Sequence, residues 1–267
     1  MDDSREPFLI PSEKEIPLAG GRVTQGVVRV GDTVRRPVNP RSAFIHSVLL
    51  HLEKKGVSGV PQYLGQDEKG RESITFLPGV CPDDLGEFTD EQIGAAMEIV
   101  RRCHDALLDF PACKEHETVT VCHNDLSPCN FLFTEGIPSG LIDWDAAGLG
   151  SPLDDLAYVA WMWLDVGNEE HDPKIVGSRM EQMLEAYKEA GNSAIFPSLP
   201  AYGDFLSRIG QQMERVGKSV FPSEEQTMAT RQWTVKCRNW LLTNWNTLIL
   251  GMEQKREPSL SYLKEKK

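Results

Sequence analysis

The chain has 267 residues, 40% of them hydrophobic and 25% charged, a composition typical of an ordinary globular protein large enough for two lobes. Its formal net charge of −12 argues against nucleic acid as a partner, because nucleic-acid binding needs a basic surface. No apolar run approaches the roughly 18 residues that a membrane-spanning helix needs, so we expect no membrane partner.

The cysteines and the first residues bear on the compartment. Six cysteines are scattered along the chain without a C-x-x-C pair. Cys122 and Cys129 lie near each other, but no second Cys/His cluster is present to complete a zinc site. Residues 1–7 are acidic and lack the apolar segment of a secretory signal. We therefore expect reduced thiols and a cytoplasmic protein.

The first part of the chain predicts a small β lobe with one helix. Five short segments between turn residues predict strands, and a segment with apolar residues at helical spacing lies between the third and the fourth. The strands fall within residues 18–37, 60–65 and 72–77, and the helix within 42–55. Pro78-Gly79 then interrupts the pattern. We expect this lobe to span residues 1–78.

The remainder, residues 79–267, predicts a larger helical lobe. Thr89-Asp90-Glu91-Gln92 has the sequence of a capping box, and the apolar residues after it share one face of a helix. Four further helices are predicted over residues 154–166, 174–191, 201–216 and 223–252. The expected fold class is therefore α+β, with a small antiparallel sheet and a larger helical lobe.

The chemistry of the chain is concentrated around a predicted hairpin at residues 131–142. The hairpin would bring Asn130 and Asp143 to the same end, with Asp125 on the loop just before it. Phosphoryl transfer needs a carboxylate that orients the attacking hydroxyl and oxygen ligands that hold Mg²⁺. We interpret Asp125 as the catalytic base and Asn130 and Asp143 as Mg²⁺ ligands. The alternative for each is ordinary turn chemistry.

These residues resemble the motifs of the aminoglycoside phosphotransferase and choline kinase family, relatives of the protein kinases. The family's catalytic loop, H-x-D-x-x-x-x-N, matches His123 to Asn130, and its I-D-[WFY] triplet matches residues 142–144. A later D-x-x-x-D-L-A segment corresponds to residues 151–157, which keep the second Asp, Asp155, but not the first. The resemblance implies a two-lobed protein-kinase-like fold with a cleft between the lobes.

The resemblance also implies supporting and nucleotide-binding residues. His123 and Asp155 would hold the catalytic loop in place. The nucleotide would be bound by a glycine turn over its phosphates and by a hinge whose backbone reads the purine. These implied binding residues are Gly20, Gly21, Thr75, Phe76 and Leu77. From the residues alone, the glycine pair is more often a plain hairpin turn and Phe76 a strand aromatic.

The chain departs from the protein-kinase pattern at the phosphate-binding Lys of the third strand. Arg35 aligns with that Lys, and Arg36 is then expected to face outward because strand side chains alternate. Arg can hold phosphate in a bidentate manner, although a surface charge is the alternative for Arg35. The predicted helix offers no Glu to pair with the Arg, and His46 lies nearest. The choice between ATP and GTP therefore stays open.

The resemblance implies a small-molecule kinase with Mg²⁺ as cofactor and ATP or GTP as donor. It would transfer the γ-phosphoryl to a hydroxyl of an amino alcohol, a sugar or an aminoglycoside-like antibiotic, as a monomer or a homodimer. Residues 161–163 and the acidic stretch 165–172 could line the acceptor pocket, although an aromatic core patch followed by a solvated loop is the plainer interpretation. The missing helix Glu leaves an alternative of another class, a catalytically silent nucleotide-binding regulatory protein.

Overall fold

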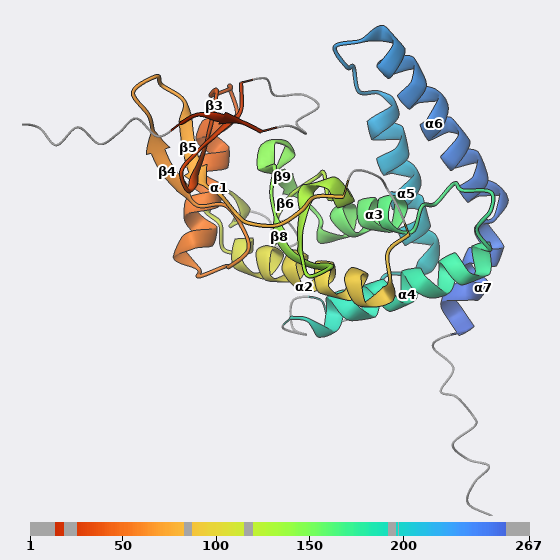
Figure 1. Cartoon of the computed structure of the whole chain (residues 1–267). Coiled ribbons are helices and arrows are strands. Elements are labelled where there is room, and N and C mark those ends of the chain that lie inside the picture. Colours follow the sequence, from red (N-terminus) through yellow and green to blue (C-terminus); the bar gives the residue numbers. More distant parts are fainter. Residues whose placement is uncertain are drawn as a thin grey trace, which may run out of the picture.

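The computed structural model describes residues 14–18, 26–82, 87–114, 120–191, 196 and 198–254. A five-stranded antiparallel sheet lies at one side of the molecule, and most of the helices gather at the other (Figure 1). Two short strand pairs lie between them. The predicted α+β class, with a small sheet and a larger helical part, is confirmed.

The five-stranded sheet has the order β1-β2-β3-β5-β4. Its strands are β1 (Ile16–Pro17), β2 (Val28–Val30), β3 (Thr33–Arg36), β4 (Tyr63–Gln66) and β5 (Glu72–Thr75). In the β3–β5 register Arg35 lies opposite Ser73 and Arg36 lies opposite Glu72. The register therefore gives Arg36, and not Arg35, a carboxylate as its cross-strand neighbour.

Helix α1 (Ser42–Lys54) joins β3 to β4 and packs on α2 (Asp90–Leu107). The apolar positions predicted at helical spacing form one buried face, each residue at most 2% exposed: Ile45, Val48, Leu49 and Leu52. Gly56 follows the helix with a φ of +72°, a left-handed conformation that favours glycine at a helix end.

Helix α1 and the residues before β4 are bonded to the helical side of the molecule. The Nε2 of His51 on α1 lies 3.1 Å from the carbonyl oxygen of Ala106 on α2. The carbonyl of Gly59 accepts a hydrogen bond of 2.7 Å from the backbone N–H of Leu141. The segment around α1 is thus attached to the central strands as well as to the sheet.

Two short antiparallel strand pairs occupy the middle of the molecule. They are β6 (Thr120–Cys122) with β9 (Gly148–Gly150), and β7 (Phe131–Thr134) with β8 (Ile137–Leu141). The second pair confirms the hairpin predicted from the sequence. Val80, on the connection from the sheet, exchanges two backbone hydrogen bonds with Phe133, of 3.0 and 2.9 Å. The connection is therefore fastened to the hairpin.

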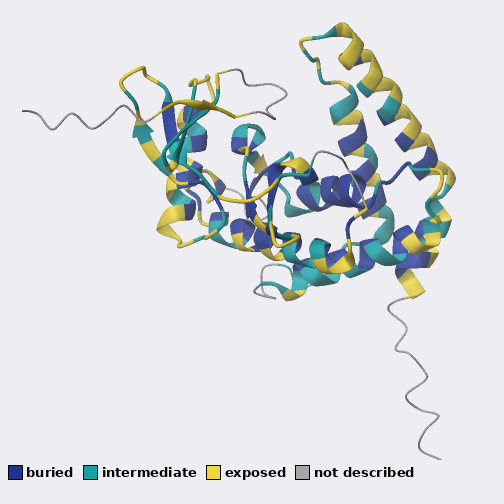
Figure 2. Cartoon of the chain, viewed as in Figure 1, coloured by how far each residue is buried: buried dark blue, intermediate teal, exposed yellow. Residues whose placement is uncertain are grey.

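The helical part is built around α3. Besides α2, the helices of this part are α3 (Pro152–Trp163), α4 (Pro173–Glu189), α5 (Tyr202–Gly217), α6 (Glu224–Thr243) and α7 (Trp245–Gln254). Helices α4 and α5 pack on α3, which is buried from Leu156 to Trp163 (dark blue in Figure 2). Helices α5 and α6 pack on each other, and α6 keeps an exposed outer face (yellow in Figure 2). None of the helices within the described ranges is long and apolar enough to span a bilayer.

The single helix predicted over residues 223–252 is wrong, because the structure breaks it at Asn244. The side-chain amide of Asn244 donates to the carbonyl of Trp240 at 2.9 Å, and its backbone N–H bonds to the same carbonyl at 3.0 Å. A side chain that bonds to the backbone in this way competes with continuation of the helix. The turn redirects the chain so that Leu248 and Met252 of α7 are fully buried.

Helices α4 and α7 approach each other closely at two glycines. A Cβ atom on Gly177 would lie 2.2 Å from the carbonyl oxygen of Leu248, and one on Gly251 would lie 2.2 Å from that of Lys174. Neither helix could keep its place if these residues carried side chains. The contact therefore depends on the absence of a methyl group on each side.

Candidate active site

Asp155, on the first turn of α3, holds the beginning of the catalytic loop. Its buried carboxylate accepts hydrogen bonds from the backbone N–H groups of His123 at 2.7 Å and Asn124 at 2.8 Å. Nε2 of His104 lies 3.0 Å from the same carboxylate, and Nδ1 lies 2.8 Å from the hydroxyl of Tyr187. Burial disfavours the ionised form, but His104 and the loop N–H groups outweigh burial and hold the pKa of Asp155 below its ordinary value.

His104, Cys122 and Asp155 form a buried group whose potential ligand atoms lie within 4.8 Å of one another. Both ring nitrogens of His104 already have hydrogen-bond partners. Burial raises the pKa of the Cys122 thiol well above its ordinary value, and its Sγ donates to the backbone carbonyl of Ser151 at 3.2 Å. The group therefore supports the loop and is not a metal site.

The carboxylate of Asp125 is oriented by two hydroxyl groups. Ser127 donates to Oδ1 at 3.0 Å, and Tyr158 of α3 donates to the same oxygen at 2.9 Å. Burial, followed by the charge of Asp125, raises the pKa of Tyr158 well above its ordinary value. The phenol is therefore protonated and able to donate at neutral pH. Both hydrogen bonds fall on one oxygen, which fixes the direction of the carboxylate.

Asn130 and Asp143 lie at the same end of the β7–β8 hairpin, as the spacing predicts. The side-chain amide of Asn130 donates to the backbone carbonyl of Asp125 at 2.8 Å, and the backbone carbonyl of Asn130 accepts from the N–H of Ile142 at 2.9 Å. The amide is thus oriented by its nitrogen, and its oxygen is directed elsewhere. These bonds connect all three predicted catalytic residues within one short segment of backbone.

Asp143 has an unusual backbone and a crowded carboxylate. Its φ is +61°, a left-handed conformation that Asp tolerates better than most residues. The side chain is 52% exposed, so a ligand could approach it. Desolvation by the surrounding protein and the neighbouring charge of Asp145 raise the pKa of Asp143. A carboxylate together with an amide oxygen is a donor set that suits Mg²⁺.

His123 connects the catalytic loop to the segment of Asp143. Its Nε2 donates to the carbonyl of Ile142 at 3.0 Å, and its ring lies edge-on to that of Trp144 with 4.9 Å between centroids. The imidazole is buried, and its Nδ1 has no hydrogen-bond partner among the described residues. The predicted supporting role of His123 stays a prediction, and this geometry agrees with it.

The expectation that Arg36 faces outward is wrong. Its side chain is 11% exposed and forms an ion pair with Glu72, while its Nη2 donates to Asp145 at 2.7 Å. Its Nη1 lies 4.0 Å from the carboxylate of Asp143. Burial opposes the charged form, but Asp145 and Glu72 outweigh it and raise the pKa of Arg36. Arg36 thus faces the predicted metal ligands.

Arg35 lies on the opposite face of β3, because side chains alternate along a strand. Its Nη1 is 3.5 Å from the carboxylate of Asp67, and its Nε donates to Thr33 at 3.0 Å. Neither partner belongs to the catalytic loop or to the segment of Asp143. The structure therefore separates Arg35 from the other predicted site residues.

The acidic partner absent from the helix is supplied by a strand. Glu72 of β5 is completely buried and contacts both Arg36 and His46 of α1. The imidazole of His46 stacks on the ring of Tyr63, with centroids 3.7 Å apart. A carboxylate thus lies between the strand Arg and the helix His, so the cation at this position is charge-compensated without a helix Glu.

Residues 80–189 match the model of the phosphotransferase enzyme family. This range contains the catalytic loop, the hairpin and Asp155, which together form the site described above. The catalytic part of the chain is therefore similar to this family. The match begins at Val80, where the connection joins the hairpin, so it covers the catalytic part of the chain and leaves out the sheet.

Two curated relatives align over part of the chain. Trifolitoxin immunity protein of Rhizobium leguminosarum bv. trifolii is 34% identical over 165 residues, which are 55% of this chain and 61% of that protein. Viomycin phosphotransferase of Streptomyces vinaceus is 30% identical over 106 residues, which are 33% of this chain and 37% of that protein. The chain thus spans less than two thirds of the length of either relative.

Solved structures of phosphotransferases share the fold. A microcompartment-associated aminopropanol kinase has a TM-score of 0.56 at 14% identity, covering 84% of this chain and 90% of its own. An aminoglycoside phosphotransferase from Alicyclobacillus acidocaldarius has a TM-score of 0.52 at 11% identity, covering 94% of this chain and 98% of its own. The kinase-like fold therefore extends over both parts of the molecule, including the sheet outside the family match.

The predicted nucleotide-binding residues differ in whether their backbone N–H groups are free to bind a ligand. Gly20 and Gly21 lie outside the described residues. The backbone N–H of Thr75 bonds to Gln62 at 3.0 Å and that of Phe76 bonds to Asp32 at 2.8 Å. Neither N–H is therefore available to a purine. Leu77 is the predicted hinge residue whose N–H has no hydrogen bond in the part of the chain that the structure describes.

The plainer interpretation of residues 161–163 is correct, because these side chains belong to the core. Trp161 and Trp163 are each 1% exposed, and Trp163 donates to the carbonyl of Leu126 at 3.0 Å. The acidic stretch is used locally: Asp172 caps α4, and Asp165 accepts from Asn168 at 2.9 Å.

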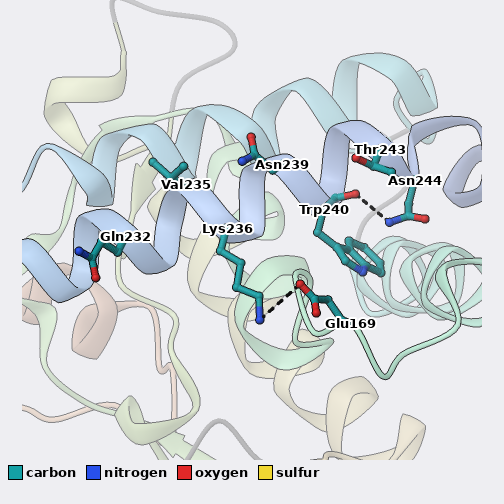
Figure 3. A pocket seen from close by; sticks show the side chains of 8 residues that line it. All are labelled: Glu169, Gln232, Val235, Lys236, Asn239, Trp240, Thr243 and Asn244. Atoms are coloured by element: carbon teal, nitrogen blue, oxygen red, sulfur yellow. Dashed lines mark hydrogen bonds and ion pairs between the residues drawn. The ribbon is translucent and has the colours of Figure 1, made fainter.

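A hollow of about 520 Å³ lies along α6, away from the catalytic loop (Figure 3). It is lined by Glu169, Gln232, Val235, Lys236, Asn239, Trp240, Thr243 and Asn244. Lys236 and Glu169 form an ion pair of 3.5 Å across it. It contains none of the phosphotransferase motif residues, so the hollow is not the catalytic site.

Two residues of the site were missed from the sequence, Glu72 and Tyr158. Glu72 could be found only with the β3–β5 register, which places it opposite Arg36. Tyr158 has a local signal, since it lies three residues after Asp155 and therefore on the same face of the helix. Tyr158 donates to the predicted base Asp125, and Glu72 forms an ion pair with Arg36.

Proposed function

We propose that the protein is a small-molecule kinase that transfers the γ-phosphoryl of Mg·ATP or Mg·GTP to a hydroxyl group. The observation that carries the proposal is the convergence of Asp125, Asn130 and Asp143 within one hydrogen-bonded segment. The match to the phosphotransferase enzyme family and the shared kinase-like fold support it. Amino alcohols, sugars and aminoglycoside-like antibiotics are the acceptor classes to test first.

Asp125 orients the acceptor hydroxyl and receives its proton. The transition state of phosphoryl transfer is loose, so correct placement of the hydroxyl matters more than the strength of the base. Ser127 and Tyr158 hold one carboxylate oxygen of Asp125. The other oxygen is then the one that faces the acceptor.

Asn130 and Asp143 are the residues that would hold Mg²⁺, through the side-chain amide oxygen and the carboxylate. Bound Mg²⁺ neutralises charge on the phosphate oxygens during transfer. Arg36, in place of the predicted Arg35, provides a cation beside Asp143 that can bind phosphate oxygens. His123 and Asp155 keep the loop and the Asp143 segment in register.

The nucleotide is placed between the two parts of the chain. We assign residues 1–78 to the nucleotide-binding lobe and residues 79–267 to the catalytic and acceptor-binding lobe. Leu77 would contribute the hinge N–H to the purine, and Gly20 and Gly21 stay the residues expected to bind the phosphates. We further propose a cytoplasmic enzyme that acts as a monomer or a homodimer, with cysteines kept as thiols.

The alternative, a catalytically silent nucleotide-binding protein, rested on the missing helix Glu. Glu72 pairs with Arg36 and so supplies a carboxylate partner for the strand cation. The observation that favoured a silent protein has therefore lost its weight.

The test has two steps that separate binding from turnover. Thermal stabilisation by ATP and by GTP, with and without Mg²⁺, measures nucleotide binding, and a coupled nucleotidase assay over a panel of hydroxyl acceptors measures transfer. Asp125→Asn should abolish turnover while Mg·ATP still stabilises the protein, whereas Asp204→Asn on the exposed start of α5 should behave as wild type. Undiminished turnover in Asp125→Asn overturns the role of Asp125, and nucleotide binding without transfer to any acceptor favours the silent alternative.

A further inference from the structure

Arg215 of α5 lies against the catalytic loop, next to the proposed base. Its Nη2 donates to the backbone carbonyl of Asn124 at 2.9 Å, one residue before Asp125. Its guanidinium carbon lies 5.5 Å from the centroid of the Tyr158 ring, and the hydroxyl of that ring donates to Asp125. The guanidinium is thus held by two separate links to the residues that position the base.

The charge of Arg215 is not compensated by a carboxylate of the described residues. Its two hydrogen bonds go to uncharged oxygens, the Asn124 carbonyl and the side chain of Gln212 at 2.8 Å. Other cations on the same helix are paired: Arg208 lies 2.5 Å from Asp154, and Lys218 lies 2.6 Å from Glu214. Arg215 is exposed to solvent, so it presents a fixed positive charge at the surface beside the base.

The side chains that contact Asp125 and Arg215 are otherwise uncharged. Ser127 and Tyr158 contact the carboxylate, and Gln212 contacts the guanidinium. The other carboxylates of the site, Asp143 and Asp145, lie on the side of Arg36. On the Arg215 side of Asp125, an ammonium group of an acceptor would meet a cation, and the side chains that contact the carboxylate there are hydroxyls.

Two atoms of the Arg215 fork are used by the protein, and Nη1 has no hydrogen bond within the described residues. A guanidinium fixed through two of its nitrogens can offer the third to a ligand oxygen without loss of side-chain freedom on binding. A carboxylate carries one negative charge. A phosphate would place about two charges close to Asp125 and to the triphosphate of the donor, where repulsion opposes it.

We propose that Arg215 selects acceptors that carry a carboxylate close to the hydroxyl that is phosphorylated. The inference rests on the proposed kinase function, because Asp125 marks the position of the reacting hydroxyl. Arg215 binds the carboxylate, Asp125 binds the hydroxyl, and Tyr158 sets the spacing between the two. Arg215 is then a residue of acceptor specificity and takes no part in the transfer of the phosphoryl group.

The test uses three acceptor probes with the same hydroxyl: N-acetylserine, which is anionic, N-acetylserinamide, which is neutral, and serinamide, which is cationic. The ratio of kcat/KM values among them is measured for wild type, Arg215→Gln and Arg215→Glu. Wild type should prefer the anionic over the neutral probe by about tenfold, the usual strength of a charge-assisted contact. Arg215→Gln should remove the preference, and Arg215→Glu should reverse it. Lys218→Gln on the next turn should keep the wild-type ratio.

Either of two results overturns the inference: a wild-type preference for the neutral or cationic probe, or a ratio that stays the same in Arg215→Gln and Arg215→Glu. The second result would make Arg215 only a clamp on the loop, because a clamp affects all three probes equally. If no probe is phosphorylated, calorimetric titration of the three into the Mg·ADP-loaded protein decides, and equal affinities overturn the inference. Failure of the kinase proposal looks different, since Mg·ATP would then be turned over with no acceptor of the wider hydroxyl panel, whether or not it binds.

Discussion

The guanidinium of Arg36 and the carboxylate of Asp143 lie 4.0 Å apart, which brings a cation of the small sheet to a predicted metal ligand behind the hairpin. The same side chain pairs with Glu72 and donates to Asp145. Because Glu72 is buried, its ion pair holds the Nε of Arg36 against the sheet. The two terminal nitrogens of Arg36 point toward Asp143 and Asp145. Arg36 thus couples the position of the sheet to the chemistry of the catalytic part.

Replacement of Arg36 by Lys should weaken nucleotide binding. A Lys keeps the positive charge, but a single ammonium cannot contact Glu72, Asp143 and Asp145 together. We expect the Kd for Mg·ATP to rise about tenfold, equivalent to about 1.4 kcal/mol, in calorimetric titrations. Arg35→Lys is the matched control, and its Kd should stay within about twofold of wild type because its contact with Asp67 is partly exposed. A larger effect in Arg35→Lys than in Arg36→Lys would contradict this assignment.

Tyr158→Phe should lower kcat by about tenfold, because the base loses one of the two hydrogen bonds that orient it. The Kd for nucleotide should not follow, since the phenol contacts Asp125 and not the predicted metal ligands. The raised pKa of Tyr158 keeps the hydroxyl protonated, so the ratio of wild-type to variant kcat should be constant between about pH 6 and 9. Tyr202→Phe, whose hydroxyl bonds to the carbonyl of Met252, should retain wild-type kcat. A wild-type kcat in Tyr158→Phe would show that Ser127 alone suffices.

Asp155→Asn should destabilise the protein at neutral pH by about 3 kcal/mol, because His104 and a loop N–H lose their charged acceptor in a buried site. In the wild-type protein the lowered pKa of Asp155 sets the pH dependence of stability. The stabilising contribution of Asp155 is fully present above its unfolded-state pKa of 3.8, and it is lost as the pH falls through the lower folded-state pKa. Urea denaturation at neutral and at acidic pH should therefore show the difference between wild type and variant shrinking as the solution is acidified. Asp204→Asn should change the free energy of unfolding by less than about 0.5 kcal/mol. A difference that grew on acidification would contradict the role given to Asp155.

Gly177→Ala should lower the free energy of unfolding by about 2 kcal/mol, because the new methyl group would push α4 away from the Leu248 carbonyl. Gly94→Ala in α2 is the opposite case, since no atom lies within 4 Å of the added Cβ. It should raise the free energy by about 0.5 to 1 kcal/mol, the ordinary helix preference for Ala. Thermal and urea unfolding of the two variants would show whether the free energy of unfolding falls in Gly177→Ala and rises in Gly94→Ala. An equal change in the free energy of unfolding in both variants would mean that α4 and α7 can move apart without a loss of stability.

The sequence predicted those features that depend on local spacing. Asp125, Asn130 and Asp143 lie within one loop and one hairpin, so a short motif and a turn pattern were enough to bring them together. The orientation of Arg36 depends on the register of β3 against β5, and a shift of one residue in a strand moves a side chain to the other face. For that reason Glu72 could not be recognised as its partner.

The break at Asn244 shows a second limit of sequence patterns. Trp240 and Leu248 continue an apolar repeat across the break, so periodicity alone favours one uninterrupted helix. A side-chain bond to the Trp240 carbonyl and the burial of α7 on α4 decide otherwise. Arg215 was also beyond reach, because its partner Asn124 is 91 positions away and the contact arises only from the packing of α5 on α3.

Helix α1 and Val80 are both attached to the catalytic part of the molecule by hydrogen bonds. Helix α1 bonds to α2 through His51, the Gly59 carbonyl bonds to β8, and Val80 is fastened to β7. Everything from α1 to Gly59 therefore travels with the catalytic part, although it precedes the connection in sequence. The sheet is joined to this unit as well, because Glu72 of β5 contacts His46 of α1 and Arg36 of β3 lies 4.0 Å from Asp143.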